Sequence, residues 1–524
     1  MKKIIFSLTM LATVLLSSCT KDLDQYPIIE TTSATVYTTE ANYKAVLGKL
    51  YAAFVIGGQE KGNANPDLSS NTGQDYLRCN FNMQECGTDE VVNTWLEGDK
   101  LKGLTYLSWD ANDTWVADTY YRIYYNIALC NEFLRNATDS KIANFSEAAQ
   151  VNIRHYRAEA RFLRALSYYH ALDFFRNVPF VSENDPVGSF IPPRYTAAQI
   201  FKYIEDELVN IDGDLLTKDE IEYGHASKAA AWTLLSRLYL NAKVYTNTDR
   251  YTDCITNCKK VIAAGYSLES DYYKLFNANN NLRTNEIIFP FVIDHINTVS
   301  WGSTTYLVCG SVSTTSESQK AADYGVASPW GSMRMRSKIP ALFEANDKRA
   351  MFFTDGQKMK VDVIDDQSNG YLCAKWKNIT DDGQTPSNTG SEGVDNDYPM
   401  FRLADVYLML AESVIKGGAG SSNSEALSYV NELRKRAYGS DTDGQVTATA
   451  LTDDFILDER GRELYWEGVR RTDLIRHDKF TTDKYIWEWK GGVKEGQAVD
   501  SKYNYYPIPT SDLTANPNLH NENY

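Results

Sequence analysis

The sequence predicts a mainly α-helical protein, a scaffold of helical hairpins with loop-rich and short β segments inserted between them. Two observations indicate this class. Apolar residues recur at steps of three and four over several long stretches, which is the period of a helix with one buried face. The intervening stretches are rich in Gly, Ser, Thr and Asn and hold only short β-like runs. With 43% hydrophobic residues, the 524-residue chain can bury a sizeable core.

The chain begins with the pattern of a bacterial lipoprotein signal. A basic start at Lys2 and Lys3 precedes an apolar stretch and the tetrapeptide L-S-S-C, which ends at Cys19. We therefore expect residues 1–18 to be a signal peptide cleaved before a lipidated Cys19, and the polar residues 19–40 to be a tether. The alternative is an ordinary secreted protein in which this cysteine is incidental. Elsewhere no apolar stretch approaches the ~20 residues of a spanning helix, so we expect an anchored protein.

The clearest helix is predicted from Ser146 to Phe175. Its apolar stripe consists of Ala158, Phe162, Ala165, Tyr169 and Leu172. Arginines with the same rhythm mark another face, at Arg154, Arg157, Arg161 and Arg164. A helix with one such stripe buries it against neighbouring helices.

Further helices are predicted in pairs joined by short turns. One pair runs from Lys228 to Asn241 and from Tyr251 to Ala264, and another from Tyr398 to Lys416 and from Ser424 to Ala437. Pairs of this length resemble tetratricopeptide repeats, which bury their faces only by stacking on one another. We therefore expect residues 41–524 to form a single domain.

Two segments, at about 62–100 and 270–398, lack this periodicity. The second contains a β-like run from Glu286 to Phe291 among Gly, Ser, Thr and Asn residues. Loops carried on a rigid scaffold are where proteins usually place binding groups. We therefore expect the ligand site in these two segments.

Composition and charge exclude several functions. A formal charge of −16 would repel a phosphate backbone, so we expect no nucleic-acid partner. No C-x-x-C or H-E-x-x-H occurs, and the stretch from Asn277 to Asn281 has oxygen donors but no carboxylate, so no metal is predicted. Cys254 and Cys258, four residues apart on a predicted helix, fit neighbouring core positions. The 35 Tyr and 10 Trp suit both helix packing and stacking against sugars.

The C-terminal third carries the most distinctive motifs. They are P-M-F-R-L-A-D-V-Y-L-M-L-A-E at 399–412, E-R-G-R-E-L-Y-W-E-G-V-R-R-T-D-L-I-R at 459–476 and Y-Y-P-I-P at 505–509. Together with the lipoprotein start and the helical pairs, they resemble the SusD/RagB family of outer-membrane nutrient-binding lipoproteins, over essentially the whole mature length. T-Y-L-V-C-G at 305–310 and F-T-T-D-K-Y-I-W-E-W-K-G-G at 480–492 resemble the starch-binding members of that family.

The resemblance implies a glycan-binding protein with no catalytic activity and no cofactor. It would be lipid-anchored in the cell outer membrane, facing the exterior, above a SusC-like TonB-dependent transporter. Its cargo would be starch-type α-glucan, or maltooligosaccharides, held against an arc of aromatic rings and delivered to the transporter. Binding of a different glycan, or of peptide cargo in the same transporter system, stays open.

The resemblance assigns four carbohydrate-binding residues to this chain. Trp301, just before T-Y-L-V-C-G, stands at an arc position that is tyrosine in the starch-binding members, and Trp330 matches an arc tryptophan. Both lie in Gly/Ser/Thr-rich segments where no periodic pattern would bury them. Arg78 matches an arginine that bonds sugar hydroxyls, and Asp75 aligns beside it, although this pair would also suit a local ion pair.

The third arc position departs from the family pattern. Asn93 stands where the starch-binding members have tryptophan, and Gly98 stands where they have a sugar-bonding asparagine. Trp95 aligns with a different tryptophan, and we expect it in the core. The ligand therefore stays open between an α-glucan and another curved glucan, or a shifted subsite.

A surface glycan hydrolase is the enzymatic alternative. It would need two carboxyl groups about 5–10 Å apart around the sugar. The loop-rich segment near residue 90 offers several candidates: Asp75, Glu85, Asp89, Glu90 and Glu97.

The 459–476 motif is also rich in carboxyl groups. Its charged residues are spaced by three and four, so opposite charges meet on a helix: Glu459, Arg462, Glu463, Glu467 and Arg471. Interleaved arginines lower carboxyl pKa values, whereas a catalytic acid needs a raised one. We therefore predict a structural role for this motif and a protein that is not an enzyme.

Overall fold

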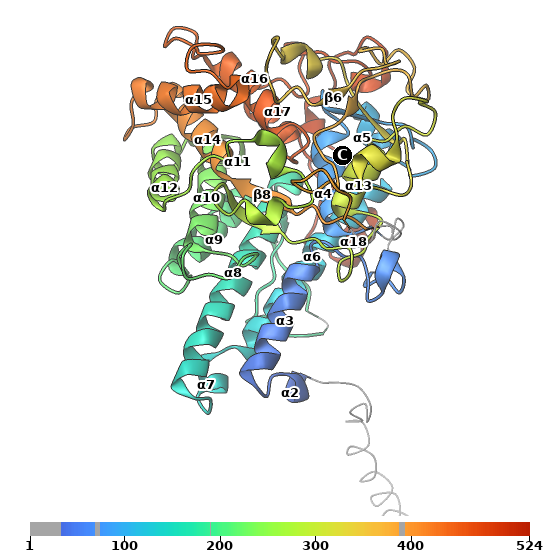
Figure 1. Cartoon of the computed structure of the whole chain (residues 1–524). Coiled ribbons are helices and arrows are strands. Elements are labelled where there is room, and N and C mark those ends of the chain that lie inside the picture. Colours follow the sequence, from blue (N-terminus) through green and yellow to red (C-terminus); the bar gives the residue numbers. More distant parts are fainter. Residues whose placement is uncertain (1–32, 69–73, 189, 387–392) are drawn as a thin grey trace, which may run out of the picture.

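The computed structural model describes residues 33–68, 74–188, 190–386 and 393–524, and it is mainly helical (Figure 1). Cys19, the signal peptide and most of the tether lie outside these residues. None of the helices in the described ranges combines the length and apolar character that crossing a membrane requires. The α-helices are α2 (Ser33–Val36), α3 (Glu40–Ala52), α4 (Tyr76–Glu85), α5 (Lys102–Tyr106), α6 (Thr114–Asn136), α7 (Asp139–Ile142), α8 (Glu147–Phe175), α9 (Ala197–Asn210), α10 (Lys228–Leu240), α11 (Ala242–Thr246), α12 (Tyr251–Ala263), α13 (Ser303–Gly310), α14 (Leu403–Ile415), α15 (Asn423–Tyr438), α16 (Asp453–Leu464), α17 (Arg470–Arg476) and α18 (Thr510–Ala515).

The strands form short antiparallel pairs. These are β1 (Val91–Asn93) with β5 (Met333–Met335), β2 (Val178–Pro179) with β3 (Arg194–Tyr195), β4 (Ile287–Phe291) with β8 (Tyr398–Arg402), and β6 (Phe352–Phe353) with β7 (Leu372–Cys373). The β-like run predicted near residue 286 is confirmed as β4. Each pair joins segments of the chain and none forms a layer of its own, so the helices remain the scaffold.

The long helix α8 confirms the prediction from the apolar stripe. Ser146 caps its N-terminus, because the Ser146 hydroxyl accepts a hydrogen bond from the Ala149 N–H over 3.3 Å. All five stripe residues are buried, and α8 packs against α3, α6 and α9. Arg164 on the arginine face is also buried, and its Nη2 lies 2.9 Å from Glu207 Oε2.

The predicted hairpins are present, with one correction. α10 packs on α12, α12 on α14, and α14 on α15, as expected for stacked pairs. The predicted helix from Tyr398 is wrong at its start, because Tyr398–Arg402 forms strand β8 and pairs with β4. Pro399 explains the difference, since the residue before a proline favours extended backbone and the helix α14 begins only after the strand. Cys254 and Cys258 are buried core neighbours with their sulfurs 3.9 Å apart.

The loop-rich segments gather on one side of the scaffold. In Figure 1, α10, α12 and α14 lie on one side of the molecule, and α5, α13 and β6 lie on the other. Segment 270–398 is irregular over most of its described length, as predicted. Segment 62–100 differs from the prediction because it contains the ten-residue helix α4. Apolar and polar residues alternate along it from Leu77 to Gln84 and all ten are buried, so no apolar stripe marks it as a helix.

Candidate functional site

Three tryptophan rings form a continuous aromatic surface on the loop-rich side. The Trp330 ring centroid lies 6.1 Å from that of Trp301 and 6.1 Å from that of Trp95, with interplanar angles of 41° and 34°. All three side chains are half-buried, so each is held by the protein and still meets solvent. We call Trp95, Trp301 and Trp330 the tryptophan platform.

A short β ladder places Trp95 beside Trp330. Strand β1 ends at Asn93 opposite Met333 of β5, and the Thr94 N–H donates to the Ser332 carbonyl over 2.8 Å, which extends the ladder. The two tryptophans follow directly beyond the paired ends. Segments more than 230 residues apart in sequence thus supply neighbouring rings.

Asp75 lies beneath the platform and shapes the segment that carries Trp301. It caps the N-terminus of α4 by accepting the Arg78 N–H over 2.8 Å, and it also accepts hydrogen bonds from the hydroxyls of Ser300 and Ser303. Burial raises the pKa of Asp75, and these hydrogen bonds oppose that rise. A Cβ on Gly302 would lie 2.2 Å from Asp75 Oδ2, so the carboxylate fits only against a glycine.

Arg78 is buried beneath the same rings. Its Nη1 donates to the Trp301 carbonyl oxygen over 3.0 Å, and its Nη2 pairs with Asp99. The guanidinium carbon also lies 4.0 Å from the centroid of the Tyr306 ring on α13, which packs against α4 (Figure 1). The structure therefore brings all four predicted residues together, with the two tryptophans at the surface and the two charged side chains below them.

Trp95 and Asp99 are the members of the site that the sequence did not indicate. The expectation that Trp95 belongs to the core is wrong, because its half-buried ring extends the platform. Asn93 is the buried residue instead: its Oδ1 accepts the Trp95 N–H over 2.8 Å and its Nδ2 donates to the Tyr306 hydroxyl over 2.6 Å. Asp99 is 24% exposed and its N–H donates to the Trp95 carbonyl, so it borders the platform. The only signal in the sequence for Trp95 and Asp99 as a pair is that they lie four residues apart, in the segment W-L-E-G-D at 95–99.

The carboxyl groups proposed for a hydrolase do not surround the platform. Asp75, Glu85, Asp89 and Glu90 are all buried, and Glu97 alone is exposed. Asp89 holds Arg470 in place, since its Oδ2 lies 2.7 Å from Arg470 Nη2. Glu90 binds the backbone, because its Oε2 accepts the Trp466 N–H over 2.6 Å. Burial raises the pKa of Glu90 to about 8. The four buried carboxyl groups serve the core in this structure.

The 459–476 motif forms α16, a turn and α17, and its charges are paired in the interior. Glu459 and Arg462 make the predicted pair over 2.8 Å. The expectation that Glu463, Glu467 and Arg471 pair along the same helix is wrong, because α16 ends at Leu464 and their partners come from other segments. Glu459 also has a distant partner, since Arg349 Nη1 lies 2.7 Å from Glu459 Oε1. Burial alone would raise the pKa of Glu459, but the arginine charges outweigh it and lower the pKa to about 2. This agrees with the predicted structural role.

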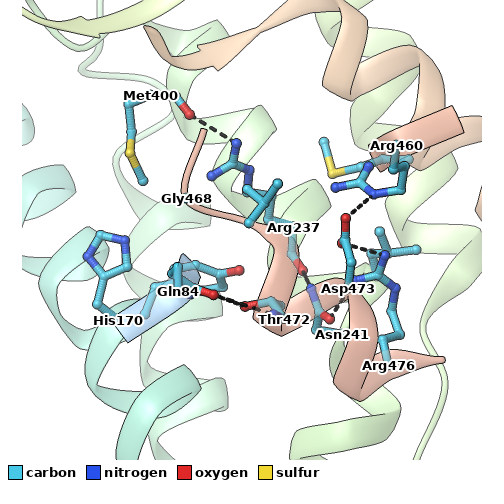
Figure 2. A pocket seen from close by; sticks show the side chains of 14 residues that line it. Gln84, His170, Arg237, Asn241, Met400, Arg460, Gly468, Thr472, Asp473 and Arg476 are labelled. Carbon is cyan, nitrogen blue, oxygen red and sulfur yellow. Dashed lines mark hydrogen bonds and ion pairs between the residues drawn. The ribbon is translucent and has the colours of Figure 1, made fainter. Parts of the chain in front are cut away.

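A small cavity lies beside α17, within the same buried charges (Figure 2). Its volume is about 20 Å³, which is room for one water molecule and no sugar ring. Asp473 crosses its wall with a 2.7 Å contact to Arg460 Nε and a 2.8 Å contact to Arg476 Nη2 (Figure 2). Burial lowers the pKa of His170, on the same wall, to about 3. The cavity is part of the scaffold.

Among the residues that the structure describes, one group of side chains has the composition of a metal site. Glu412, Asp453 and His477 place one ligand atom each within 4.8 Å of one another. However, the two His477 ring nitrogens face different carboxylates, each at 3.2 Å. Arg476 Nε lies 2.6 Å from Glu412 and Lys416 Nζ lies 2.7 Å from Asp453, so both carboxylates already have cationic partners. The geometry is that of an ion-pair cluster.

Fold and site together define a class of protein in which a rigid helical scaffold displays aromatic rings on a loop-rich face. The chain belongs to the SusD family. Residues 235–524 match that family, and residues 26–240 match a SusD-like family described as starch-binding and associating with the outer membrane. The starch-binding protein SusD of Bacteroides thetaiotaomicron is 33% identical, over 97% of this chain and 96% of its own length.

Solved structures of the superfamily have the same fold. A SusD-like carbohydrate-binding protein from Bacteroides fragilis matches 93% of this chain and 100% of its own, with a TM-score of 0.71 and 20% identity. Surface glycan-binding protein A from B. thetaiotaomicron, solved in complex with laminarihexaose, matches 93% of this chain and 100% of its own, with a TM-score of 0.68 and 18% identity. The predicted family and the mainly helical fold class are confirmed.

Proposed function

We propose that this chain is a cell-surface lipoprotein that captures starch-type α-glucan and delivers it to a SusC-like TonB-dependent transporter, without catalysing a reaction. The observation that carries the proposal is the platform of Trp95, Trp301 and Trp330, three half-exposed rings in contact. The relative that is 33% identical is named as starch-binding, which supports the choice of ligand.

The platform has the chemistry to bind a sugar chain. The C–H groups of a pyranose ring lie against aromatic faces while its hydroxyls bond to polar groups at the rim. Successive platform rings are tilted by 41° and 34°, so they follow a curved ligand better than a flat one. Each stack would contribute about 1 kcal/mol beyond the burial of its surface. Three such contacts give weak, reversible binding, which suits a protein that passes its ligand on.

The polar part of the proposed site is Asp99. Its carboxylate is partly exposed and borders Trp95, so it is placed to accept hydrogen bonds from sugar hydroxyls. In this proposal Arg78 and Asp75 act by fixing Asp99 and Trp301, rather than by bonding the sugar directly as the family resemblance implied.

The proposed location follows from the N-terminus. Acyl chains on Cys19 would hold the protein in the outer membrane, since each buried CH₂ contributes ~0.8 kcal/mol, and the domain would face the exterior. The outer-membrane association in the description of the family matched by residues 26–240 supports this location. The transporter partner rests on membership of the family.

Affinity electrophoresis of the mature chain in gels with amylopectin, laminarin, inulin, xylan or no glycan tests the ligand. We expect amylopectin to retard the protein, and Trp95→Ala, Trp301→Ala and Trp330→Ala each to abolish the retardation. Trp232→Ala is the matched control, because Trp232 is equally half-buried but lies on α10. Retardation by another glycan alone would replace the α-glucan with that glycan. No retardation in any gel would reject glycan capture and favour peptide cargo, and release of shorter sugars from maltoheptaose would reject a non-catalytic role.

A further inference from the structure

Tyr106 and Trp489 form a second aromatic pair that the tryptophan platform does not include. Their ring centroids lie 6.1 Å apart with an interplanar angle of 31°, and both side chains are half-buried. Tyr106 ends α5, and Trp489 belongs to the W-E-W-K-G-G segment near the C-terminus. The geometry of this pair matches that between neighbouring platform rings.

Trp489 is held in a backbone conformation that tryptophan rarely adopts. Its φ of 67° and ψ of 5° lie in the left-handed region, which is unfavourable for a bulky side chain. Such strain persists only where the surroundings impose it, and it concentrates at functional positions. The neighbouring Trp487, which is the first tryptophan of W-E-W, is by contrast fully buried and belongs to the core.

The surroundings fix the Trp489 ring firmly. Its indole Nε1 donates to the Val361 carbonyl oxygen over 2.8 Å, and its backbone N–H donates to the Lys494 carbonyl over 3.2 Å. The next residue, Lys490, is buried and its ammonium donates to the carbonyls of Thr482 and Tyr485 over 2.7 and 2.8 Å. A ring held by its polar edge leaves little conformational entropy to lose when a ligand stacks on its face.

The pair shares packing contacts with the segments that carry the tryptophan platform. Tyr106, Trp489 and Leu96 pack together on one small cluster of buried apolar residues, which consists of Val92, Val361 and Ile364. Leu96 directly follows Trp95 of the platform. The loop from Val361 onwards also approaches the platform at Gln367. The side chain of Gln367 packs against Gly331, the residue after Trp330: a Cβ on Gly331 would lie 2.6 Å from Gln367 Oε1. Two elements therefore link the two sets of rings.

Hydrogen-bonding groups border the pair. Asp362 and Lys494 form an ion pair over 2.9 Å, with side chains that are 42% and 48% exposed. Both residues also line an open hollow of about 430 Å³, whose lining includes Val361 and Trp487 but neither ring of the pair. An aromatic face with a carboxylate and an ammonium at its edge offers a sugar both stacking and hydroxyl contacts.

We propose that Tyr106 and Trp489 form a second sugar-stacking subsite, and that the ligand is a glucan chain long enough to occupy this subsite and the tryptophan platform together. The inference rests on the proposed function and adds a requirement for chain length. Two weak subsites on one rigid surface reinforce each other, because a ligand bound at the first presents its next units at high effective concentration to the second. A short oligosaccharide occupies only one subsite and gains nothing from the other.

Calorimetric titration of the mature chain with maltotriose and with amylopectin tests the subsite. We expect Trp489→Ala and Tyr106→Ala to weaken amylopectin binding by about tenfold, since losing one of two linked contacts removes the avidity, and to leave maltotriose binding within about twofold. Trp330→Ala should weaken both ligands. Trp489→Gly separates backbone strain at this position from sugar binding. Glycine accepts the left-handed backbone, so this variant should unfold at no lower a temperature than Trp489→Ala. It should still lose affinity for amylopectin, because the ring is absent.

The outcomes separate the two hypotheses. Wild-type protein that binds neither ligand overturns the proposed α-glucan function and the subsite with it. Wild-type binding that Trp489→Ala leaves unchanged for both ligands overturns the subsite alone. Equal weakening of maltotriose and amylopectin by Trp489→Ala also overturns it, because the residue would then act by supporting the platform.

Discussion

The buried guanidinium of Arg78 donates a hydrogen bond to the carbonyl oxygen of Trp301 over 3.0 Å, from a side chain that is only 3% exposed. The contact joins the helix α4 to the irregular segment that carries a platform ring. It also sets the partly exposed carboxylate of Asp99 at the edge of Trp95, since the same guanidinium pairs with Asp99. One cation thus positions two parts of the proposed site from below.

Replacing Arg78 with methionine should weaken glycan binding without removing any ring. Arg78→Met loses the hydrogen bond to Trp301 and leaves Asp99 without its partner, so we expect about a tenfold lower affinity for amylopectin and a loss of about 1–3 kcal/mol in unfolding free energy. Titration calorimetry and denaturant unfolding measure the two effects. Arg154→Met, at an exposed ion pair with Asp139, is the control and should change neither. Unchanged binding by Arg78→Met would show that the platform does not depend on this contact.

Gly302 is expected to tolerate no side chain. In Gly302→Ala the new Cβ would lie 2.2 Å from Asp75 Oδ2, within a carboxylate already bound by Ser300 and Ser303. The segment must shift, so we expect a loss of about 1–3 kcal/mol in stability and displacement of the adjacent Trp301. Thermal unfolding and intrinsic tryptophan fluorescence report both. Gly98→Ala, with open space around its Cβ, should behave as wild type, and equal behaviour of the two variants would contradict the packing described here.

Asn93→Trp tests which residue supplies the third ring. Asn93 is fully buried and bonds both the Trp95 backbone and the Tyr306 hydroxyl, so a tryptophan there would overpack the interior and break two hydrogen bonds. We expect a loss of at least about 2 kcal/mol in stability and no gain in amylopectin affinity. Trp95→Phe is the conservative comparison and should retain most of the binding. Tighter binding by a stable Asn93→Trp protein would instead return the third position to residue 93.

The buried carboxyl of Glu90 should make stability depend on pH. Burial raises its pKa from 4.5 to about 8, so the folded protein holds this proton more tightly than the unfolded chain does. The contribution of Glu90 to stability is therefore complete below pH 4.5 and is lost as the pH rises towards 8. Glu90→Gln keeps an oxygen for the Trp466 N–H and carries no titratable proton.

Denaturant unfolding of both proteins between pH 5 and 8 measures this effect. The stability of Glu90→Gln relative to wild type should rise with pH, with a slope of at most about 1.4 kcal/mol per pH unit for one proton. Glu97→Gln, at an exposed carboxylate, should follow wild type at every pH. Parallel curves for wild type and Glu90→Gln would mean that Glu90 is ionised throughout.

The scaffold could be predicted where apolar residues recur at steps of three and four over a long stretch. The stripe on α8 and the hairpin of α10 and α12 show the helical period, and their bounds agree with the structure within about one residue. The helix α4 could not be predicted in this way, because its apolar and polar residues alternate from Leu77 to Gln84, which is not a helical period, and tertiary contacts bury both kinds. The strand at residues 398–402 could not be predicted from the local pattern, because its partner strand β4 is more than 100 residues away.

The identity of the site residues could be predicted better than the burial of their side chains. Trp301, Trp330, Arg78 and Asp75 lie together as the family resemblance indicated, but their burial depends on tertiary contacts. Asp75 faces Ser300 and Ser303, more than 220 residues further along the chain, and these contacts place its carboxylate beneath the surface. The exposure of Trp95 could not be predicted, because it is set by the pairing of β1 with β5 and by the burial of Asn93.

The ladder between β1 and β5 has a consequence for how such a protein diversifies. The three platform rings come from separate segments, and the paired arginines and carboxylates of the helical scaffold lie elsewhere, around Glu459 and Arg349. A substitution at one ring therefore changes the proposed binding surface without removing any of these buried ion pairs. This separation would let the proposed glycan preference change while the charged core of the scaffold is kept.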